Sequence, residues 1–324
     1  MRAQLVMTPQ LAGAVFDDAL RDRLRGVAEV DVDRVVSDPR ELDPAELAAV
    51  DVLITGWGAA PIDERLLAAM PALRAIVHWG GGVGFISPAV GARGVAVSTG
   101  REANAVPVAE WTVAMLVLAA KDAFWMSRRY ATERRALDRE ELMPRSGLFR
   151  TVIGLVGASS VGRLVIDRLR SYDVDVLLYD PFVTPEDAAA MGVELLGDLG
   201  ALAARASLLS LHAPETPATA GMVSRSVLAS LPDGATLVNT ARGALVDQDA
   251  LIDELRAGRL RAILDVTDPD VLPPEHPLHE LPNVFLTPHL AGSTGYELHR
   301  LGESAVAEVE RFARGIPFAH PIEP

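Results

Sequence analysis

Three kinds of side chain that suit proton and anion chemistry occur between Thr236 and Gly292. They are Arg242 in the segment NTARG, the acids of the segment LDVTDPD, and His289 in the segment TPH. A guanidinium group binds a carboxylate through two parallel hydrogen bonds. A histidine paired with a carboxylate can donate or accept a proton near neutral pH. Together these groups would bind a 2-oxo or 2-hydroxy acid and move its proton.

Two of these side chains follow short apolar runs that predict buried strands. Arg242 comes after residues 236–238, and Asp265 comes after residues 262–264. In an open α/β sheet the carboxyl ends of the strands border the ligand crevice. We therefore expect Arg242, Asp265 and His289 to meet at this edge of the sheet. A surface arginine and a structural histidine are the alternative interpretations.

The carboxylate that pairs with His289 is one of two acids. Such a partner would orient the imidazole and stabilise its protonated form. Asp270 is our candidate and Asp268 is its rival, because the sequence does not separate them by geometry. For both acids a plain turn among the neighbouring prolines is the alternative. We expect Asp265, which ends a predicted strand, to meet the nicotinamide of a bound cofactor instead.

The cofactor signal lies between a predicted strand at residues 151–156 and a predicted helix, where the chain reads GASSVG. Gly157 allows a tight turn, Gly162 allows close helix packing, and free N–H groups face a pyrophosphate. Asp180 would accept hydrogen bonds from the adenosine ribose and repel a 2′-phosphate, which favours NAD over NADP. Ser159 replaces the usual middle glycine and weakens the motif, so a turn without a ligand is the alternative.

The elements that position these residues alternate along the whole chain. Apolar strand-like runs and helical patterns take turns, which predicts parallel sheets with right-handed crossovers and an α/β fold. The first series of predicted strands covers residues 5–7, 30–32, 52–55, 75–78 and 95–98, with helices at 14–25, 44–49, 63–69 and 87–92. The second series covers residues 151–156, 174–179, 206–211, 236–238, 262–264 and 284–286.

Longer segments predict how the two series are joined. Residues 104–125 predict a long apolar helix that links two domains or packs against a partner subunit. The charged residues 128–150 predict a surface excursion, and a last helix at 296–313 is long enough to return to the first domain. No apolar run reaches the ~18–20 residues of a membrane span, and residues 111–120 predict a buried helix.

The composition excludes several classes of protein. A chain of 324 residues is expected to form one or two domains. Its net charge of −14 argues against a general binder of nucleic acid or anionic membranes. Because it has no cysteine, it has no disulfide, thiol nucleophile or Cys-ligated metal. The N-terminus MRAQLVMTPQ lacks the pattern of a signal peptide, so we expect a cytoplasmic protein.

The sequence resembles the D-isomer-specific 2-hydroxyacid dehydrogenase family. The matching segments follow the family order over most of the chain: NAVPVAEW, GLVGASSVG, YDP, SLHAPETPAT, VNTARGALVD, LDVTDPD and PNVFLTPHLAG. The resemblance implies two doubly wound parallel-sheet domains. A Rossmann NAD-binding domain would span residues 103–292, and a smaller, discontinuous flavodoxin-like substrate domain would span 1–102 plus 293–324.

The resemblance also implies hydride transfer between NAD(H) and C2 of a small 2-oxo or D-2-hydroxy acid across a domain cleft. Arg242 would bind the carboxylate, Asp270 and His289 would form the acid and base, and no metal would be needed. Further cofactor contacts would come from Ser160, Val161, His212, Pro214, Thr219, Thr240, Ala241, Asp265 and Gly292. Further substrate contacts would come from Gly81, Gly82, Val83 and Asn104. Family members are commonly homodimers built around the helix at residues 104–125.

The sequence departs from the family pattern in ways that leave the substrate open. Asp270 stands where glutamate is usual, and Gly84 and Ser87 stand where aspartates are common. We expect no further domain after residue 324, unlike many phosphoglycerate dehydrogenases. Two other functions stay open: a non-catalytic NAD-sensing interaction protein, and a dehydrogenase of a small anion such as formate or phosphite. The intact Arg242 and His289 favour the hydroxyacid dehydrogenase.

Overall fold

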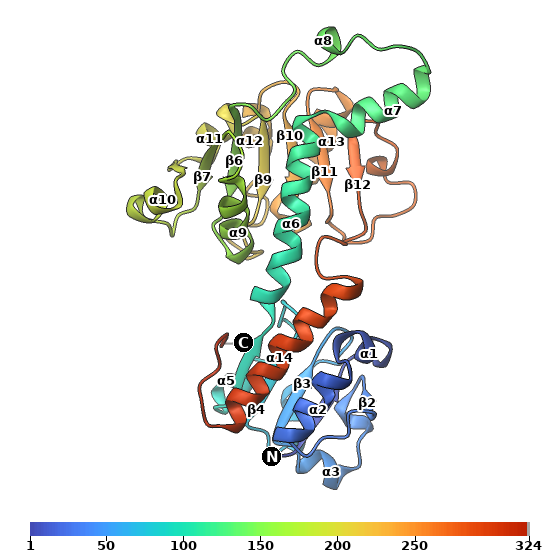
Figure 1. Ribbon diagram of the computed structural model, residues 1–324, viewed down its shortest axis with the longest axis vertical. Helices are drawn as coiled ribbons and strands as arrows, with labels where there is room; N and C mark the ends of the chain where they lie inside the picture. Colours follow the sequence, from blue (N-terminus) through green and yellow to red (C-terminus); the bar gives the residue numbers. More distant parts are fainter. Residues whose placement is uncertain (323–324) are drawn as a thin grey trace. The chain divides into compact units, whose positions relative to one another are not determined.

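The computed structural model describes residues 1–322, and these form two compact units (Figure 1). Unit 1 contains Met1–Ala105 and the segment that begins at Ser293, and unit 2 contains Val106–Gly292. The chain passes from unit 1 to unit 2 inside helix α6 (Arg101–Ala120). The two crossings predicted from the resemblance lie near residues 102 and 293. The last two residues of the predicted range 293–324 lie outside the described residues.

Unit 1 is built on a five-stranded parallel sheet with the order β2-β1-β3-β4-β5. Every residue of β1, β3 and β4 is buried, as expected for strands covered on both faces. This is the flavodoxin-like doubly wound order that the sequence predicted. The strands are β1 (Ala3–Val6), β2 (Val35–Val36), β3 (Val52–Thr55), β4 (Ala75–His78) and β5 (Ala96–Thr99).

Helices cover both faces of this sheet, because each face carries its own hydrophobic cluster. One cluster contains side chains of α1 (Ala12–Val15), α2 (Asp18–Val27) and α14 (Leu298–Ala313). The other contains side chains of α3 (Pro44–Ala48), α4 (Glu64–Ala69) and α5 (Ala89–Ala92). Helix α14, which comes last among the described helices, packs against α1, α2 and β4 of the same unit (Figure 1).

Unit 2 is built on a seven-stranded parallel sheet with the order β12-β11-β10-β9-β6-β7-β8. The order reverses between β6 and β9, which is the switch point where doubly wound sheets bind nucleotides. The Rossmann prediction is therefore confirmed. The strands are β6 (Thr151–Val156), β7 (Val174–Tyr179), β8 (Glu194–Leu195), β9 (Leu208–Leu211), β10 (Thr236–Asn239), β11 (Arg261–Leu264) and β12 (Val284–Leu286).

The helices of unit 2 also form two layers. Helices α6, α9 (Ser160–Leu169) and α10 (Pro185–Met191) share one hydrophobic cluster with the sheet. Helices α11 (Leu199–Arg205), α12 (Arg225–Ser230) and α13 (Gln248–Arg256) share the other. The loops that follow β6, β7, β9, β10, β11 and β12 at their carboxyl ends hold the candidate site residues of unit 2.

Two predicted elements of unit 1 are wrong. Residues 30–32 do not form a strand, and the strand lies at Val35–Val36 instead. Val32 is apolar because its side chain is buried, although its backbone forms a turn. The helix predicted at residues 14–25 is broken into α1 and α2. Asp17 makes this break, since its extended backbone and its side chain, which accepts a hydrogen bond from Leu20 N–H, begin α2.

The long helix predicted at residues 104–125 ends earlier than expected. Asp122 has a left-handed backbone with φ of 53°, after which α7 (Ala123–Glu133) begins. A further short helix, α8 (Arg139–Leu142), interrupts the expected surface excursion. By length and composition α6 could cross a membrane, with a mean hydropathy of 1.5, but half of that window is buried inside the protein. We therefore interpret α6 as a core helix.

One glycine sets how closely α14 approaches the start of the chain. A Cβ added at Gly302 would lie 2.0 Å from the carbonyl oxygen of Val15, which belongs to the backbone and cannot move aside. We predict that Gly302→Ala lowers the free energy of unfolding by about 1–3 kcal/mol, as overpacking does. Urea denaturation of the full chain measures this change.

Gly26→Ala is the matched control, because Gly26 lies in helix α2 and a Cβ there meets nothing within 4 Å. We expect this variant to be as stable as the wild type or more stable, since alanine favours helix. Equal stability of Gly302→Ala and the wild type would show that the close approach is not needed.

Candidate active site

The turn after β10 presents Arg242 at the carboxyl end of the sheet. Asn239 closes this turn: its amide nitrogen donates to Arg242 O at 2.8 Å, and its amide oxygen accepts from Ala241 N–H at 3.0 Å. The Arg242 Nη1 donates to Ala241 O at 2.6 Å. The side chain is exposed, and it makes no salt bridge within residues 1–322. The guanidinium is therefore free to bind an anion.

Gly243 brings this turn against the segment that carries the acids. A Cβ added at Gly243 would lie 2.1 Å from the carbonyl carbon of Thr267, so only glycine allows the two backbones to touch. Thr267 then donates its hydroxyl to Pro269 O at 2.8 Å and lies 3.3 Å from Asp270 O. The peptide bond between Asp268 and Pro269 is cis. This close packing places Arg242 and Asp270 on the same side of the sheet edge.

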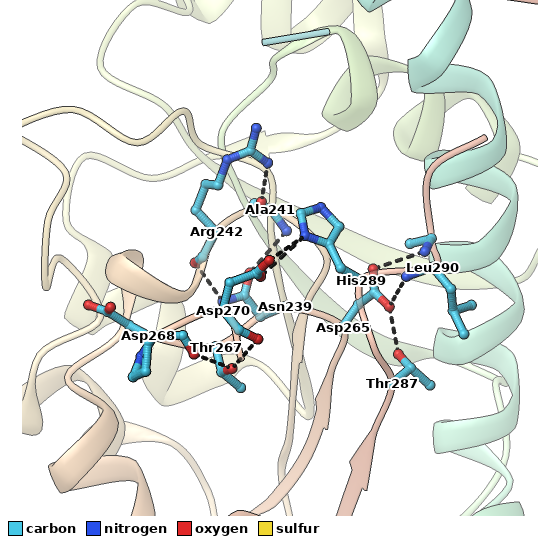
Figure 2. Close-up of polar contacts among 12 residues, drawn as sticks. Asn239, Ala241, Arg242, Asp265, Thr267, Asp268, Asp270, Thr287, His289 and Leu290 are labelled. Carbon is cyan, nitrogen blue, oxygen red and sulfur yellow. Dashed lines mark hydrogen bonds and ion pairs between the residues drawn. The ribbon is translucent and has the colours of Figure 1, made fainter. Parts of the chain in front are cut away.

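The structure brings Asp270 to His289 and turns Asp268 away (Figure 2). The Nδ1 of His289 lies 3.2 Å and 3.3 Å from the two carboxylate oxygens of Asp270. The backbone of Asp268 exchanges hydrogen bonds with the side-chain amide of Gln248 at 2.6 Å and 3.1 Å. Of the two acids that the sequence left open, the geometry therefore favours Asp270 as the partner of the imidazole.

The backbone of His289 adopts a conformation that non-glycine residues rarely take. Its φ is 54°, in the left-handed region, which costs about 1–2 kcal/mol for most side chains. Its N–H donates to Asp265 O at 2.9 Å and to Thr287 O at 3.1 Å, which holds the residue in place. The side chain is 48% exposed. The imidazole thus projects to solvent with its Nδ1 on Asp270.

Asp265 is the buried group that fixes this loop (Figure 2). It is 2% exposed, and its carboxylate accepts hydrogen bonds from Thr287 Oγ1 at 2.6 Å, Leu290 N–H at 2.8 Å and Ala291 N–H at 2.9 Å. The contact of Asp265 with a nicotinamide stays a prediction. In the structure its carboxylate, directly after β11, holds the loop that carries His289.

The glycine turn after β6 has the close contacts that a phosphate-binding turn needs. Gly157 has φ of 97°, and a Cβ there would lie 2.7 Å from Ala213 N, while a Cβ at Gly162 would lie 2.2 Å from Gly157 O. Ser159 has ordinary φ of −63°, and its hydroxyl accepts a hydrogen bond from Gly162 N–H, so it caps α9. A serine therefore fits where the motif usually has glycine.

Asp180 ties this turn to the end of β7. One carboxylate oxygen accepts from Ala158 N–H at 2.7 Å, and the other accepts from Phe182 N–H at 2.8 Å. A carboxylate has about four lone-pair positions, so both oxygens keep capacity for the hydroxyls of a ribose. The turn, the first residues of α9 and Asp180 together fit the phosphate and ribose of a dinucleotide.

Other residues predicted to contact the cofactor lie around this turn in different environments. The imidazole of His212 is buried below Gly162, its Nε2 lies 3.0 Å from Ser210 Oγ, and burial lowers its pKa to about 3. This side chain packs under the turn, so it does not present a charge to a ligand. Thr240 is also buried, with its hydroxyl 2.9 Å from that of Thr112.

The remaining predicted cofactor residues lie on the loops of unit 2. Thr219 closes the loop after β9 by donating its hydroxyl to Pro214 O at 2.6 Å. Ser160 and Val161 form the first turn of α9, Ala241 precedes Arg242, and Gly292 is the last residue of unit 2. Asn239 and Thr287 were not among the predicted site residues, although both stand beside predicted ones, in the segments VNTARG and LTPH.

In unit 1 the loop after β4 exposes a row of backbone donors. Gly80 O accepts from Gly100 N–H at 3.0 Å and from Thr99 Oγ1 at 2.8 Å, and Gly81 O lies 3.2 Å from the same hydroxyl. The N–H groups of residues 81–83 have no acceptor among residues 1–322. Successive free N–H groups form an anion-binding concavity. The carbonyl groups of Gly80 and Gly81 are hydrogen-bonded within the protein, whereas the N–H groups of residues 81–83 are available to bind a carboxylate.

Asn104, also predicted to contact substrate, has a structural contact in unit 1. Its side-chain oxygen accepts from Ser293 N–H at 3.0 Å, and its amide nitrogen lies 3.9 Å from a Cβ added at Gly81. It therefore joins α6, the returning chain and the amide loop. Among the described residues no cluster of three or more His, Asp or Glu side chains could hold a metal ion.

Comparison with known proteins gives a consistent set of relatives. Residues 113–291 match the family described as D-isomer specific 2-hydroxyacid dehydrogenase, NAD binding domain. The D-3-phosphoglycerate dehydrogenase of Mycobacterium tuberculosis is 36% identical over 292 residues, which cover 88% of this chain and 53% of the relative. The (S)-sulfolactate dehydrogenase of Chromohalobacter salexigens is 31% identical over 307 residues, which cover 94% of this chain and 98% of the relative.

A solved structure supports the same assignment of fold. The TT0316 protein from Thermus thermophilus has a TM-score of 0.78 and 31% identity, over 99% of this chain and 100% of that one. The chain spans about half the length of the phosphoglycerate dehydrogenases that it matches.

We predict that Asp265→Asn loosens the loop at residues 287–291. Asparagine keeps one acceptor oxygen and turns its NH2 group toward the N–H of either Leu290 or Ala291, which leaves that backbone donor unpaired in a buried site. Such a loss costs about 1–3 kcal/mol. Hydrogen–deuterium exchange of these amides should therefore become faster by about tenfold or more.

Asp268→Asn makes the same chemical change three residues along, where the carboxylate has no hydrogen bond among the described residues. We expect exchange in the loop to be unchanged in this control. Equal exchange rates in the two variants would contradict the role given to Asp265.

The stability of the protein should fall in acid because of His78, which lies under the amide loop. Burial lowers its pKa from 6.5 to about 4. Below pH 6.5 the unfolded chain takes up a proton that the folded chain binds only near pH 4, so stability is complete above pH 6.5 and decreases between the two values. The decrease is about 3 kcal/mol when complete.

The measurement for His78 is urea denaturation at a series of pH values. Between pH 4.5 and 6 the unfolding free energy of His78→Gln should depend less steeply on pH than that of the wild type. The difference in slope should correspond to about one proton taken up on unfolding. Buried His212 supplies a similar slope in both proteins, so only the difference is informative. An identical slope would show that His78 is protonated in the folded state.

Proposed function

The chain belongs to the D-isomer specific 2-hydroxyacid dehydrogenase family, and we propose that it is an NAD(H)-dependent oxidoreductase of small 2-oxo and D-2-hydroxy acids. The observation that carries this proposal is the group at the carboxyl edge of the sheet of unit 2. There, a guanidinium with no salt-bridge partner among residues 1–322 accompanies an imidazole that is paired with a carboxylate. An anion site beside a proton donor is what reduction of a 2-oxo acid requires.

Three side chains would bind the substrate, donate the proton and orient the proton donor. NADH, held at the glycine turn and Asp180, would supply the hydride that reduces C2. Arg242 binds the carboxylate of the substrate and polarises the 2-oxo group. The Nε2 of protonated His289 donates a proton to the oxygen on C2 as negative charge develops there. Asp270 at Nδ1 orients the ring and stabilises the imidazolium. The balanced reaction converts 2-oxo acid, NADH and a proton to 2-hydroxy acid and NAD.

The cofactor site of the proposal is the glycine turn of unit 2. Backbone N–H groups at the start of α9 would bind the pyrophosphate, where the helix dipole favours negative charge. Asp180 would accept hydrogen bonds from the adenosine ribose and repel the extra phosphate of NADP. The buried His212 and Thr240 support this turn and the neighbouring strand end from below.

Unit 1 takes part through its amide loop. The free N–H groups of Gly81, Gly82 and Val83 would bind the substrate carboxylate, and Asn104 would hold this loop in place. We also propose a cytoplasmic homodimer that packs through helix α6. The half-exposed Leu118 on α6 and the exposed Tyr130 on α7 give this surface apolar side chains for a second copy.

We predict that His289→Asn abolishes turnover while NADH still binds. Asparagine tolerates the left-handed backbone of this residue, so the loop keeps its shape. Loss of the proton donor should lower kcat for glyoxylate by about 10²–10⁴-fold. The Kd for NADH, measured by fluorescence titration, should change less than about threefold, because no cofactor contact is removed.

Asp270→Asn should lower kcat in the same direction, and Asp268→Asn is its matched control with near-normal kcat. Near-normal turnover of His289→Asn would refute the proposed acid. If the wild type binds NADH but reduces no 2-oxo acid, the non-catalytic NAD-sensing protein is the better interpretation. Oxidation of formate or phosphite alone would favour the small-anion dehydrogenase.

A further inference from the structure

An aromatic side chain borders the amide loop of unit 1. Trp57 follows β3, and this residue is 37% exposed. A Cβ added at Gly80 would lie 2.8 Å from Trp57 Nε1 and 2.6 Å from His78 Nε2. The indole therefore lies directly against the start of the loop whose free N–H groups suit a carboxylate. A substrate held by those N–H groups would place its next atoms within reach of Trp57.

The position of Trp57 is fixed by a second, buried indole. The ring of Trp79 is fully buried, and Trp57 meets it edge-on, with ring centroids 4.9 Å apart and an interplanar angle of 65°. Trp79 occupies the space that a side chain at Gly56 would need, since a Cβ there would lie 1.9 Å from the Trp79 ring. The packing against Trp79 therefore fixes the orientation of the Trp57 indole.

The rings in contact with Trp57 and Phe85, those of Trp79 and His78, carry no charge at physiological pH. His78 is buried and neutral at physiological pH, its Nδ1 lies 3.1 Å from Thr55 Oγ1, and its ring contacts Phe85 with centroids 5.0 Å apart. The basic residue next to the loop is Arg101, whose Cα lies 3.9 Å from a Cβ added at Gly81 and whose side chain is exposed. A second anionic group placed against Trp57 and Phe85 would lose part of its hydration to aromatic rings that give it no charged partner.

We propose that this aromatic wall, formed by Trp57 and Phe85, selects 2-oxo acids with an uncharged apolar side chain over those that carry a phosphate or sulfonate. The inference rests on the proposed function and names its substrate class. Trp57 is the specificity-determining residue, because its indole is exposed and borders the carboxylate-binding loop. Two relatives of this chain are named for substrates with phosphate and sulfonate groups, so the proposal separates this chain from them.

The first test compares substrates with the full wild-type chain and NADH. Glyoxylate, which has no side chain, is the reference; phenylpyruvate is the apolar substrate, and phosphohydroxypyruvate and sulfopyruvate are the anionic ones. We expect kcat/KM for phenylpyruvate to exceed both anionic values by at least about tenfold. A preference for either anionic substrate overturns the inference but leaves the proposed function standing. Reduction of none of the four, glyoxylate included, overturns the proposed function itself.

The second test changes the wall. Trp57→Ala should lower the ratio of kcat/KM for phenylpyruvate to that for glyoxylate by about tenfold or more, mainly through KM, because apolar contact is lost. Trp57→Leu keeps an apolar side chain and should lose less. Tyr172→Ala is the matched control, since Tyr172 has the same 37% exposure in unit 2 and should leave the ratio unchanged.

Trp57→Arg is the reverse variant and should raise kcat/KM for phosphohydroxypyruvate relative to phenylpyruvate. Melting curves of all variants show whether they remain folded, and the smaller change in Trp57→Leu keeps the test valid if Trp57→Ala is unstable. An unchanged ratio in folded Trp57→Ala and Trp57→Leu would overturn the role of this residue.

Discussion

The candidate active site depends on one buried carboxylate. Asp265 follows β11 and accepts three hydrogen bonds from the loop that follows β12. A buried carboxylate needs such donors, and a loop with free N–H groups needs such an acceptor, so each satisfies the other. The result is that His289 is held in an unfavourable backbone conformation with its ring on Asp270. The acid that orders the loop and the acid that pairs with the ring are therefore different residues.

Close backbone approach is the second constraint on the site. Gly157, Gly162 and Gly243 each stand where a Cβ would overlap main-chain atoms of a neighbouring segment. These contacts join the turn after β6 to the strand beside it, and the turn after β10 to the segment that carries Asp270. The sheet supplies parallel strand ends, and the glycines bring the loops at those ends together. Charged and hydrogen-bonding groups far apart in the sequence become neighbours for this reason.

Much of the fold and the glycine turn was predictable, because the residues that determine them are close together in the sequence. Alternating apolar runs gave the two doubly wound sheets, and the turn around Gly157 has strand, glycine and helix in one short segment. The strand predicted at residues 30–32 was wrong because Val32 lies in a turn and still buries its side chain. An apolar sequence pattern does not distinguish such a turn from a strand. The choice between Asp268 and Asp270 depends on the path of the chain around Pro269. The partners of Asp265 lie more than twenty residues away, beyond any local pattern.

The left-handed backbone at His289 also restricts what evolution and protein engineering can place there. Valine, isoleucine and threonine are disfavoured in this conformation whatever their chemistry, while asparagine and glycine adopt it readily. A saturation library at this codon would therefore be filtered twice, first by whether each variant yields folded protein and then by proton transfer. Histidine is among the residue types enriched in the left-handed region, so it meets both the backbone requirement and the requirement for proton transfer.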